Sequence, residues 1–151
     1  MEQAHHYFEM GLRLSHDGDC ENSIDLFSIA IDLNPQFGEA YGYRGLAYHI
    51  LGIYQEAMDN YNKALSLDSS LEKVYFFRGT LHSKLSHYQE AINDLSIAIE
   101  WNNFFDDAYL YRAACRGLLD DRKGVIYDLQ CAAQLGNRVA QKVLGSKGIA
   151  W

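Results

Sequence analysis

The chain has 151 residues, a hydrophobic fraction of 48%, a single proline and a formal net charge of −7. These values are typical of one soluble, ordered, helix-rich domain that is long enough to bury a core. The negative charge argues against general nucleic-acid binding, which needs clustered lysine and arginine, and no apolar run approaches the roughly 18 residues of a membrane span.

The N-terminal segment MEQAHHYFEM has neither the basic nor the apolar region of a signal peptide, so we predict a cytoplasmic location. The three cysteines, Cys20, Cys115 and Cys131, are too widely spaced for a disulfide framework or a zinc site. We expect all three to be reduced, with Cys115 and Cys131 largely buried.

The chain repeats itself every 34 residues, and we call each set of residues at this spacing a column. Three of the columns are Tyr7, Tyr41, Tyr75 and Tyr109; Gly11, Gly45, Gly79 and Ala113; and Ala30, Ala64, Ala98 and Ala132. Such a period is typical of arrays built from one supersecondary unit. The units that follow from it cover residues 4–37, 38–71, 72–105 and 106–139.

Each unit is predicted to hold two amphipathic helices, because apolar residues recur at i, i+3, i+4 and i+7. In the second unit these helices cover 39–51 and 54–67, with Gly52 in the turn between them. Turn formers and helix caps mark the unit ends at Asn34-Pro35, Ser69-Ser70 and Asn102-Asn103. After the fourth unit, an apolar stripe predicts a short capping helix over 138–144.

These columns resemble the tetratricopeptide repeat, a 34-residue helix–turn–helix unit with an aromatic residue, Leu-Gly, tyrosine, a small residue, an aromatic residue, alanine and proline at fixed positions. The first unit matches this pattern with Tyr7, Met10, Gly11, Leu14, Ser23, Phe27, Ala30 and Pro35. The resemblance implies an all-α fold: a right-handed superhelix of four helical hairpins plus the cap, forming a single domain over 1–151 in a small stand-alone protein.

Arginine replaces the usual leucine of the family at three positions, Arg44, Arg78 and Arg112. We expect these side chains to lie along the neighbouring helix and to pair with acids such as Asp94 and Asp128.

Glycines are expected where the two helices of a hairpin approach closely, because a residue without a side chain lets the backbones touch. In this interpretation Gly11, Gly45 and Gly79 face the small residues Ser23, Ala57 and Ala91. Gly42 is different, since its column reads Phe8, Gly42, Phe76 and Leu110.

The resemblance implies that three columns line the inner, concave surface of the superhelix: those of Phe8, of Glu9 and of His5. From these columns we select a candidate peptide-binding set, which comprises Phe8, Gly42, Tyr43, Lys73, Phe76, Phe77 and Tyr111. Its aromatic members would form a wall, and Gly42 would open a notch between Phe8 and Phe76. Core packing of Phe8 and Phe76 is the alternative. A stripe of exposed aromatic residues more often marks a binding surface.

One subclass of the family clamps the C-terminal carboxylate of a chaperone with two lysines, two asparagines and an arginine. The corresponding positions here hold Phe8, Leu12, Tyr43, Lys73 and Phe77, and only Lys73 matches. The groove is therefore predicted to prefer apolar or aromatic side chains of an extended or helical segment.

The six histidines have no metal-binding or catalytic spacing, and no nucleotide-binding glycine loop is present. We predict a non-enzymatic scaffold or adaptor that binds a protein or peptide and needs no cofactor, nucleic acid or membrane. The alternatives are a dedicated chaperone for one client protein and an enzyme with a site assembled from distant repeats.

The charge is unevenly distributed along the chain. Residues 1–37 hold seven acids and one base, whereas residues 106–151 hold five acids and seven bases. The simplest explanation is that both the acidic and the basic side chains lie on solvent-exposed faces. The sharper alternatives are an oriented ligand and weak head-to-tail self-association, which a heterologous contact would permit.

Overall fold

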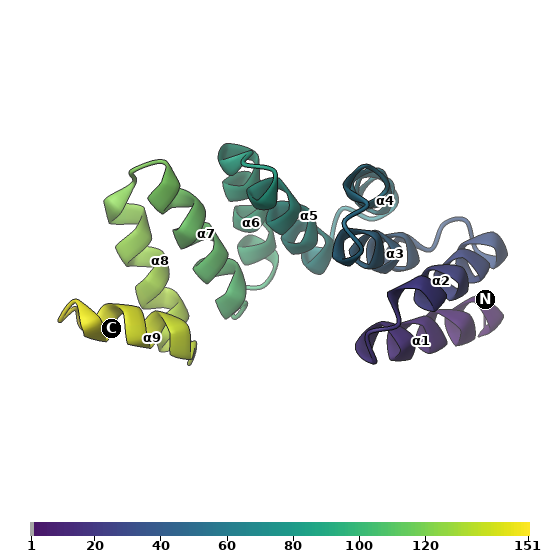
Figure 1. Cartoon of the computed structure of the whole chain (residues 1–151), viewed down its shortest axis with the longest axis horizontal. Helices are drawn as coiled ribbons and strands as arrows, with labels where there is room; N and C mark the ends of the chain where they lie inside the picture. Colours follow the sequence, from purple (N-terminus) through teal and green to yellow (C-terminus); the bar gives the residue numbers. More distant parts are fainter. Residues whose placement is uncertain (1) are drawn as a thin grey trace. The chain divides into compact units, whose positions relative to one another are not determined.

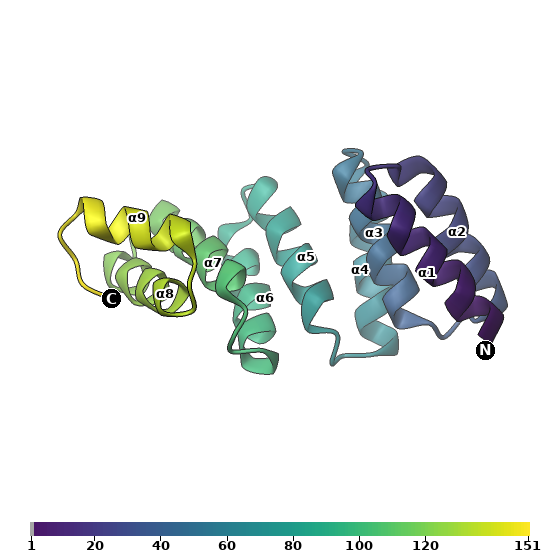
Figure 2. The same ribbon diagram turned by 90° about the horizontal axis from the view of Figure 1, so that it is seen from below.

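The computed structural model describes residues 2–151. The helices of this part of the chain are α1 (Glu2–His16), α2 (Cys20–Leu33), α3 (Gly38–Ile50), α4 (Tyr54–Leu67), α5 (Glu72–Lys84), α6 (Tyr88–Trp101), α7 (Asp106–Leu118), α8 (Arg122–Gln134) and α9 (Arg138–Ser146). Successive helices pair into four hairpins, α1/α2 to α7/α8, and α9 packs on α8 (Figures 1 and 2). The prediction of an all-α fold with four hairpins and a C-terminal helix is confirmed.

The helices divide into two compact units, residues 1–77 and 78–151, with the boundary inside α5. In the first unit Phe27, Ala57 and Tyr61 are completely buried, and in the second Leu81, Leu95 and Leu144 are. That the whole chain acts as one domain stays a prediction.

The turn inside each hairpin needs one residue with a left-handed backbone. The same column supplies it every time: Gly18, Gly52, Ser86 and Asp120 have φ between 60° and 87°. Glycine adopts this conformation without steric cost. Ser86 and Asp120 adopt it at the cost of a close contact between Cβ and the backbone. The repeat therefore fixes the turn geometry even where its residue type is lost.

The nearest side chain to each hairpin glycine is a large one, although the Ala91 carbonyl oxygen, as predicted, also lies 3.4 Å from a Cβ built on Gly79. A Cβ added to Gly11 would lie 2.7 Å from the Phe27 ring, and one added to Gly45 would lie 2.8 Å from the Tyr61 ring. The predicted pairing with Ser23 and Ala57 is therefore wrong by one helical turn. The glycine makes room for a ring that packs against its backbone.

The arginine column forms the expected polar pairs. Arg78 donates to both Asp94 oxygens at 2.8 Å, and Arg112 donates to the two Asp128 oxygens at 2.7 and 3.0 Å. These two pairs confirm the prediction. Arg44 instead donates to the amide oxygen of Asn60 at 2.9 Å.

Two of these arginines also join their hairpin to the preceding one. Arg44 donates to the Ser28 hydroxyl at 3.0 Å, and Arg112 donates to the Ser96 hydroxyl at 2.9 Å. Arg44 and Arg112 therefore face the preceding hairpin. In the first hairpin, the same position holds Met10.

All three cysteines are free thiols. Cys20 and Cys115 are buried, whereas Cys131 is half-exposed, so the expected burial holds fully for Cys115 and only partly for Cys131. Burial raises the pKa of the Cys115 thiol, which keeps it protonated and unreactive.

His82 lies inside the second unit with its ring beside the Arg78–Asp94 pair. Its Nε2 is 3.9 Å from an Asp94 oxygen, and its buried Nδ1 has no hydrogen-bond partner among the described residues. Burial lowers the pKa of His82 below its ordinary value of 6.5, Arg78 and His87 add to this effect, and Asp94 opposes it. The folded protein therefore prefers neutral His82.

We expect the free energy of unfolding to fall as the pH drops from about 7 to about 5. The unfolded chain gains a proton at His82 at a higher pH than the folded protein, so protonation favours unfolding. Chemical denaturation at several pH values measures this dependence. A His82→Gln variant should show a smaller loss between these pH values, and an equal loss would contradict the assignment to His82.

Candidate functional site

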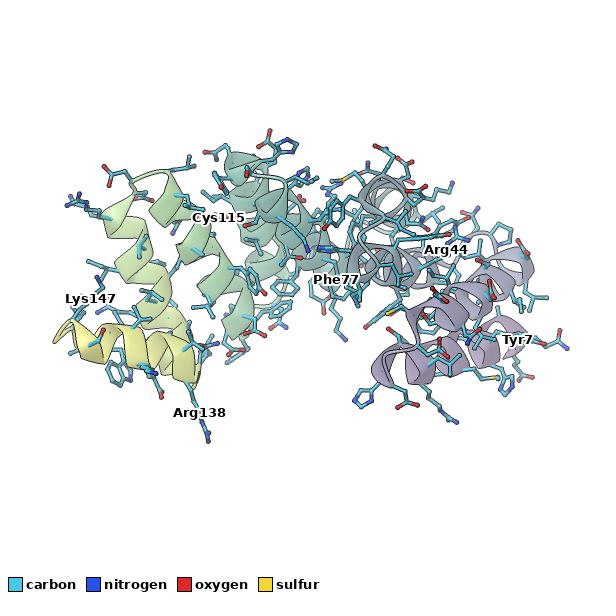
Figure 3. The ribbon with its side chains drawn as sticks, viewed as in Figure 1. Tyr7, Arg44, Phe77, Cys115, Arg138 and Lys147 are labelled. Carbon is cyan, nitrogen blue, oxygen red and sulfur yellow. The ribbon has the colours of Figure 1, made fainter. Side chains whose placement is uncertain are left out.

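Three successive first helices each contribute one aromatic ring to a row in the first unit. Phe8 comes from α1, Tyr43 from α3 and Phe77, labelled in Figure 3, from α5. The Phe8 and Tyr43 ring centroids are 5.6 Å apart, and those of Tyr43 and Phe77 are 5.7 Å apart, both edge to face. These distances suit favourable aromatic pairs. We call Phe8, Tyr43 and Phe77 the aromatic row.

The members of the aromatic row differ in exposure. Phe8 is only 6% exposed, because Phe37 and Phe27 pack against it with ring centroids 4.8 and 5.8 Å away. Phe8 therefore supports the row from the core, which was the alternative interpretation of this residue. Tyr43 and Phe77 are half-buried and offer part of each ring to solvent.

Phe76 lies next to the aromatic row and is also half-buried. Its ring centroid is 6.2 Å from that of Phe77. Tyr111 lies on α7 in the second unit, where it is 44% exposed. Four of the five selected aromatic residues therefore lie in the first unit, and Tyr111 lies in the second.

A small pocket of about 100 Å³ opens beside Tyr43. Its lining residues come from the start of α3 and from the start of α5 with the turn before it: Glu39, Tyr43, Leu71, Glu72, Lys73 and Val74. The Lys73 ammonium donates to the Tyr43 hydroxyl at 3.4 Å. The structure therefore brings Tyr43 and Lys73 together, as a polar extension of the aromatic row.

The expected notch at Gly42 is absent. Gly42 is buried, and a Cβ built on it would lie 2.5 Å from Cγ2 of Val74 and 3.9 Å from Cβ of Ala64. The missing side chain lets α5 approach α3 closely, so the space is filled from within the protein. The assignment of Gly42 to the binding surface is therefore wrong, and an alanine here would have to displace Val74.

Sequence reasoning did not select the two carboxylates of the pocket. Glu39 stands in the column of Lys73, so the column pattern could have identified it. Glu72 carries no such signal, because its column, which also holds Ala4, Gly38 and Asp106, is not one of the three that the resemblance places on the inner surface.

Across residues 2–151 there is no group of three or more His, Cys, Asp or Glu side chains that could hold a metal ion. None of the helices described is both long and apolar enough to span a membrane.

Comparison with known proteins places this geometry in a family. The sequence model of the family described as tetratricopeptide repeat matches residues 38–71, the second predicted unit. An uncharacterised protein of Methanocaldococcus jannaschii is 37% identical over 57 residues, which cover 38% of this chain and 66% of that protein. The match therefore spans somewhat less than two thirds of this relative.

Solved structures of such repeats share the fold. MamA (residues 41 to the end) from Desulfovibrio magneticus RS-1 has a TM-score of 0.78 at 20% identity, over 90% of this chain and 77% of that one. The TPR domain of OM64 from Arabidopsis has a TM-score of 0.73 at 25% identity, over 77% and 96%.

A third similar structure is the first TPR of Spaghetti (RPAP3) bound to the HSP90 peptide SRMEEVD. It has a TM-score of 0.76 at 24% identity, over 79% of this chain and 97% of that one. The 34-residue columns, the four hairpins and these matches agree. Residues 38–71 match the tetratricopeptide-repeat family, and the chain has the fold of tetratricopeptide-repeat proteins.

Proposed function

We propose that this protein is a non-enzymatic interaction scaffold that binds a peptide segment of a partner protein along the aromatic row. The observation that carries the proposal is the juxtaposition of half-exposed Tyr43 and Phe77 with the pocket that contains Lys73. Stacks of helical repeats bind partners on extended surfaces, and rigid aromatic side chains are the usual anchors of such binding. The RPAP3 neighbour, which is bound to a peptide, supports this use of the fold.

The chemistry of the surface suggests which segment would bind. Tyr43 and Phe77 offer apolar ring faces, which suit an aromatic or aliphatic anchor residue. The adjoining pocket holds two carboxylates, Glu39 and Glu72, against one ammonium group, Lys73. Since its net charge is negative, the pocket favours a basic residue beside the anchor.

This chemistry differs from that of a carboxylate clamp. At the clamp positions Phe8, Leu12 and Phe77 have no side-chain hydrogen-bond donor, so only Lys73 and the Tyr43 hydroxyl could donate to a peptide carboxylate. We therefore propose a segment recognised through its side chains, in the cytoplasm, where the three free cysteines stay reduced. A dedicated chaperone for a single client would use the same surface.

We expect display selection on the immobilised protein to enrich peptides with an apolar anchor next to lysine or arginine. The double variant Tyr43→Ala/Phe77→Ala should bind the best selected peptide at least about tenfold more weakly, since truncated anchors typically cost more than about 1 kcal/mol each. Fluorescence anisotropy with the labelled peptide measures the affinity.

Circular dichroism and thermal melting must show that the double variant keeps its helices. Tyr127→Ala is the matched control, because Tyr127 is an exposed tyrosine on α8 in the second unit. Lys73→Glu should strengthen binding of basic peptides and leave the anchor preference unchanged. If the selected peptides bind the double variant as well as the original protein, the aromatic row is not the binding surface.

A further inference from the structure

The C-terminal end of the array contains half of a fifth hairpin. Ala140 and Leu144 on α9 follow Ala4 and Phe8 by four periods of 34 residues, and all four side chains are buried. Helix α9 packs on α8 as α3 packs on α2. Helix α9 therefore stands in the position of a first helix, and residues 147–151 form no second helix. Instead, the chain turns at Gly148, and the Ala150 carbonyl accepts a hydrogen bond from Gln130.

An apolar pocket of about 470 Å³ opens where that second helix would pack. Its apolar lining comes from Val125, Ile126 and Leu129 of α8, from Leu144 of α9 and from Ile149. Its charged lining comes from Arg122 and Lys147 together with Asp120. Lys147 occupies the column of Gly45, which faces Tyr61 and Asn60 on the second helix of its own hairpin. Figure 3 labels Lys147 at the end of α9.

An exposed isoleucine and several cations lie on this face. Ile24 in the first hairpin is half-buried, whereas Ile126 in the same column is 40% exposed. Five cations in and around this end are exposed: Arg122, Lys123, Arg138, Lys142 and Lys147. Arg122 pairs with Asp120 at 3.2 Å, but both side chains are solvated and the pair is easily exchanged.

The N-terminal end of the array is apolar and acidic. At the position of Arg44, Arg78 and Arg112 the first hairpin holds Met10, which is 38% exposed. Leu26 replaces the polar partner, which is Asn60, Asp94 or Asp128 in the later hairpins. Around this pair the first hairpin carries seven acids and one base. Asp25, next to Leu26, is among its exposed carboxylates.

We propose that these two ends bind each other in trans, so that the α1/α2 end of one copy docks on the α8/α9 end of a second copy. Apolar side chains then meet apolar side chains, and the acidic hairpin meets the exposed cations. Two identical ends could not bind in this way, because cations would face cations or carboxylates would face carboxylates. The contact is heterologous, so it repeats head to tail. It uses no residue of the aromatic row and is independent of the proposed function.

Sedimentation velocity over a wide range of protein concentration tests the proposal. The original protein should form dimers and longer species as its concentration rises, and added salt should weaken this association. Met10→Glu breaks only the N-terminal end, and Ile126→Glu breaks only the C-terminal end. Each variant alone should associate at least about tenfold more weakly than the original protein.

Mixing the two variants separates head-to-tail binding from every symmetric alternative. The intact C-terminal end of Met10→Glu and the intact N-terminal end of Ile126→Glu should form a one-to-one dimer that cannot grow further. Ile50→Glu, at an exposed isoleucine of the second hairpin, is the matched control and should associate like the original protein. A protein that stays monomeric throughout, a single variant that still dimerises fully, or a mixture that stays monomeric would overturn the proposal.

Discussion

Replacing Asp128 with alanine is expected to lower the free energy of unfolding by about 3–5 kcal/mol. The Asp128 side chain is completely buried and accepts hydrogen bonds from two arginines, Arg112 at 2.7 and 3.0 Å and Arg116 at 2.8 Å. Alanine would leave the buried Arg112 guanidinium without its counter-charge, and an unpaired buried charge is costly. Chemical denaturation followed by circular dichroism measures the change.

The first hairpin supplies the control for this experiment. At the positions of Arg112 and Asp128 it holds Met10 and Leu26, so the fold accepts an apolar pair there. The double variant Arg112→Met/Asp128→Leu should recover most of the lost stability, because replacing both partners of a buried ion pair is often neutral. A double variant as unstable as Asp128→Ala would show that the loss comes from Arg116 or from altered packing.

The features predicted best are those that the 34-residue period repeats. The helix predicted over 54–67 is observed as Tyr54–Leu67, and the Arg78–Asp94 and Arg112–Asp128 pairs were predicted from their columns. The period determines these features because the same local geometry is built several times. Where one unit has a different residue at a position, the equivalent residues of the other units still indicate the local structure.

Features that depend on one particular neighbour were not predictable in this way. Gly42 lies in a column that the family places on the inner surface, yet the Val74 methyl group fills the space beside it. Phe8 is covered by Phe37, which follows α2 and folds back over the ring. Glu72, the first residue of α5, lines the pocket from a column outside the inner surface. The column pattern predicts on which face of its helix a residue lies. It does not predict which side chain of another helix or turn packs against that face.

Replacing Gly45 with leucine is expected to destabilise the first unit by about 3 kcal/mol or more. The Cβ alone would lie 2.8 Å from two ring carbons of Tyr61 and 3.1 Å from Cβ of Asn60, so the whole hairpin would have to open. Tyr61 is completely buried and has no free space into which its ring could move. Thermal and chemical unfolding of the variant measure the loss.

Helix propensity works against this expectation, which makes the result diagnostic. Leucine is better than glycine inside a helix by about 0.5–1 kcal/mol, so a net loss must come from the clash with Tyr61. Gly117→Leu is the matched control, since Gly117 is exposed near the end of α7 and its nearest packing atom, Cγ2 of Val125, would be 3.7 Å away. This control should be neutral or stabilising. If both variants unfold with equal free energies, the Tyr61 ring does not pack against the backbone at Gly45.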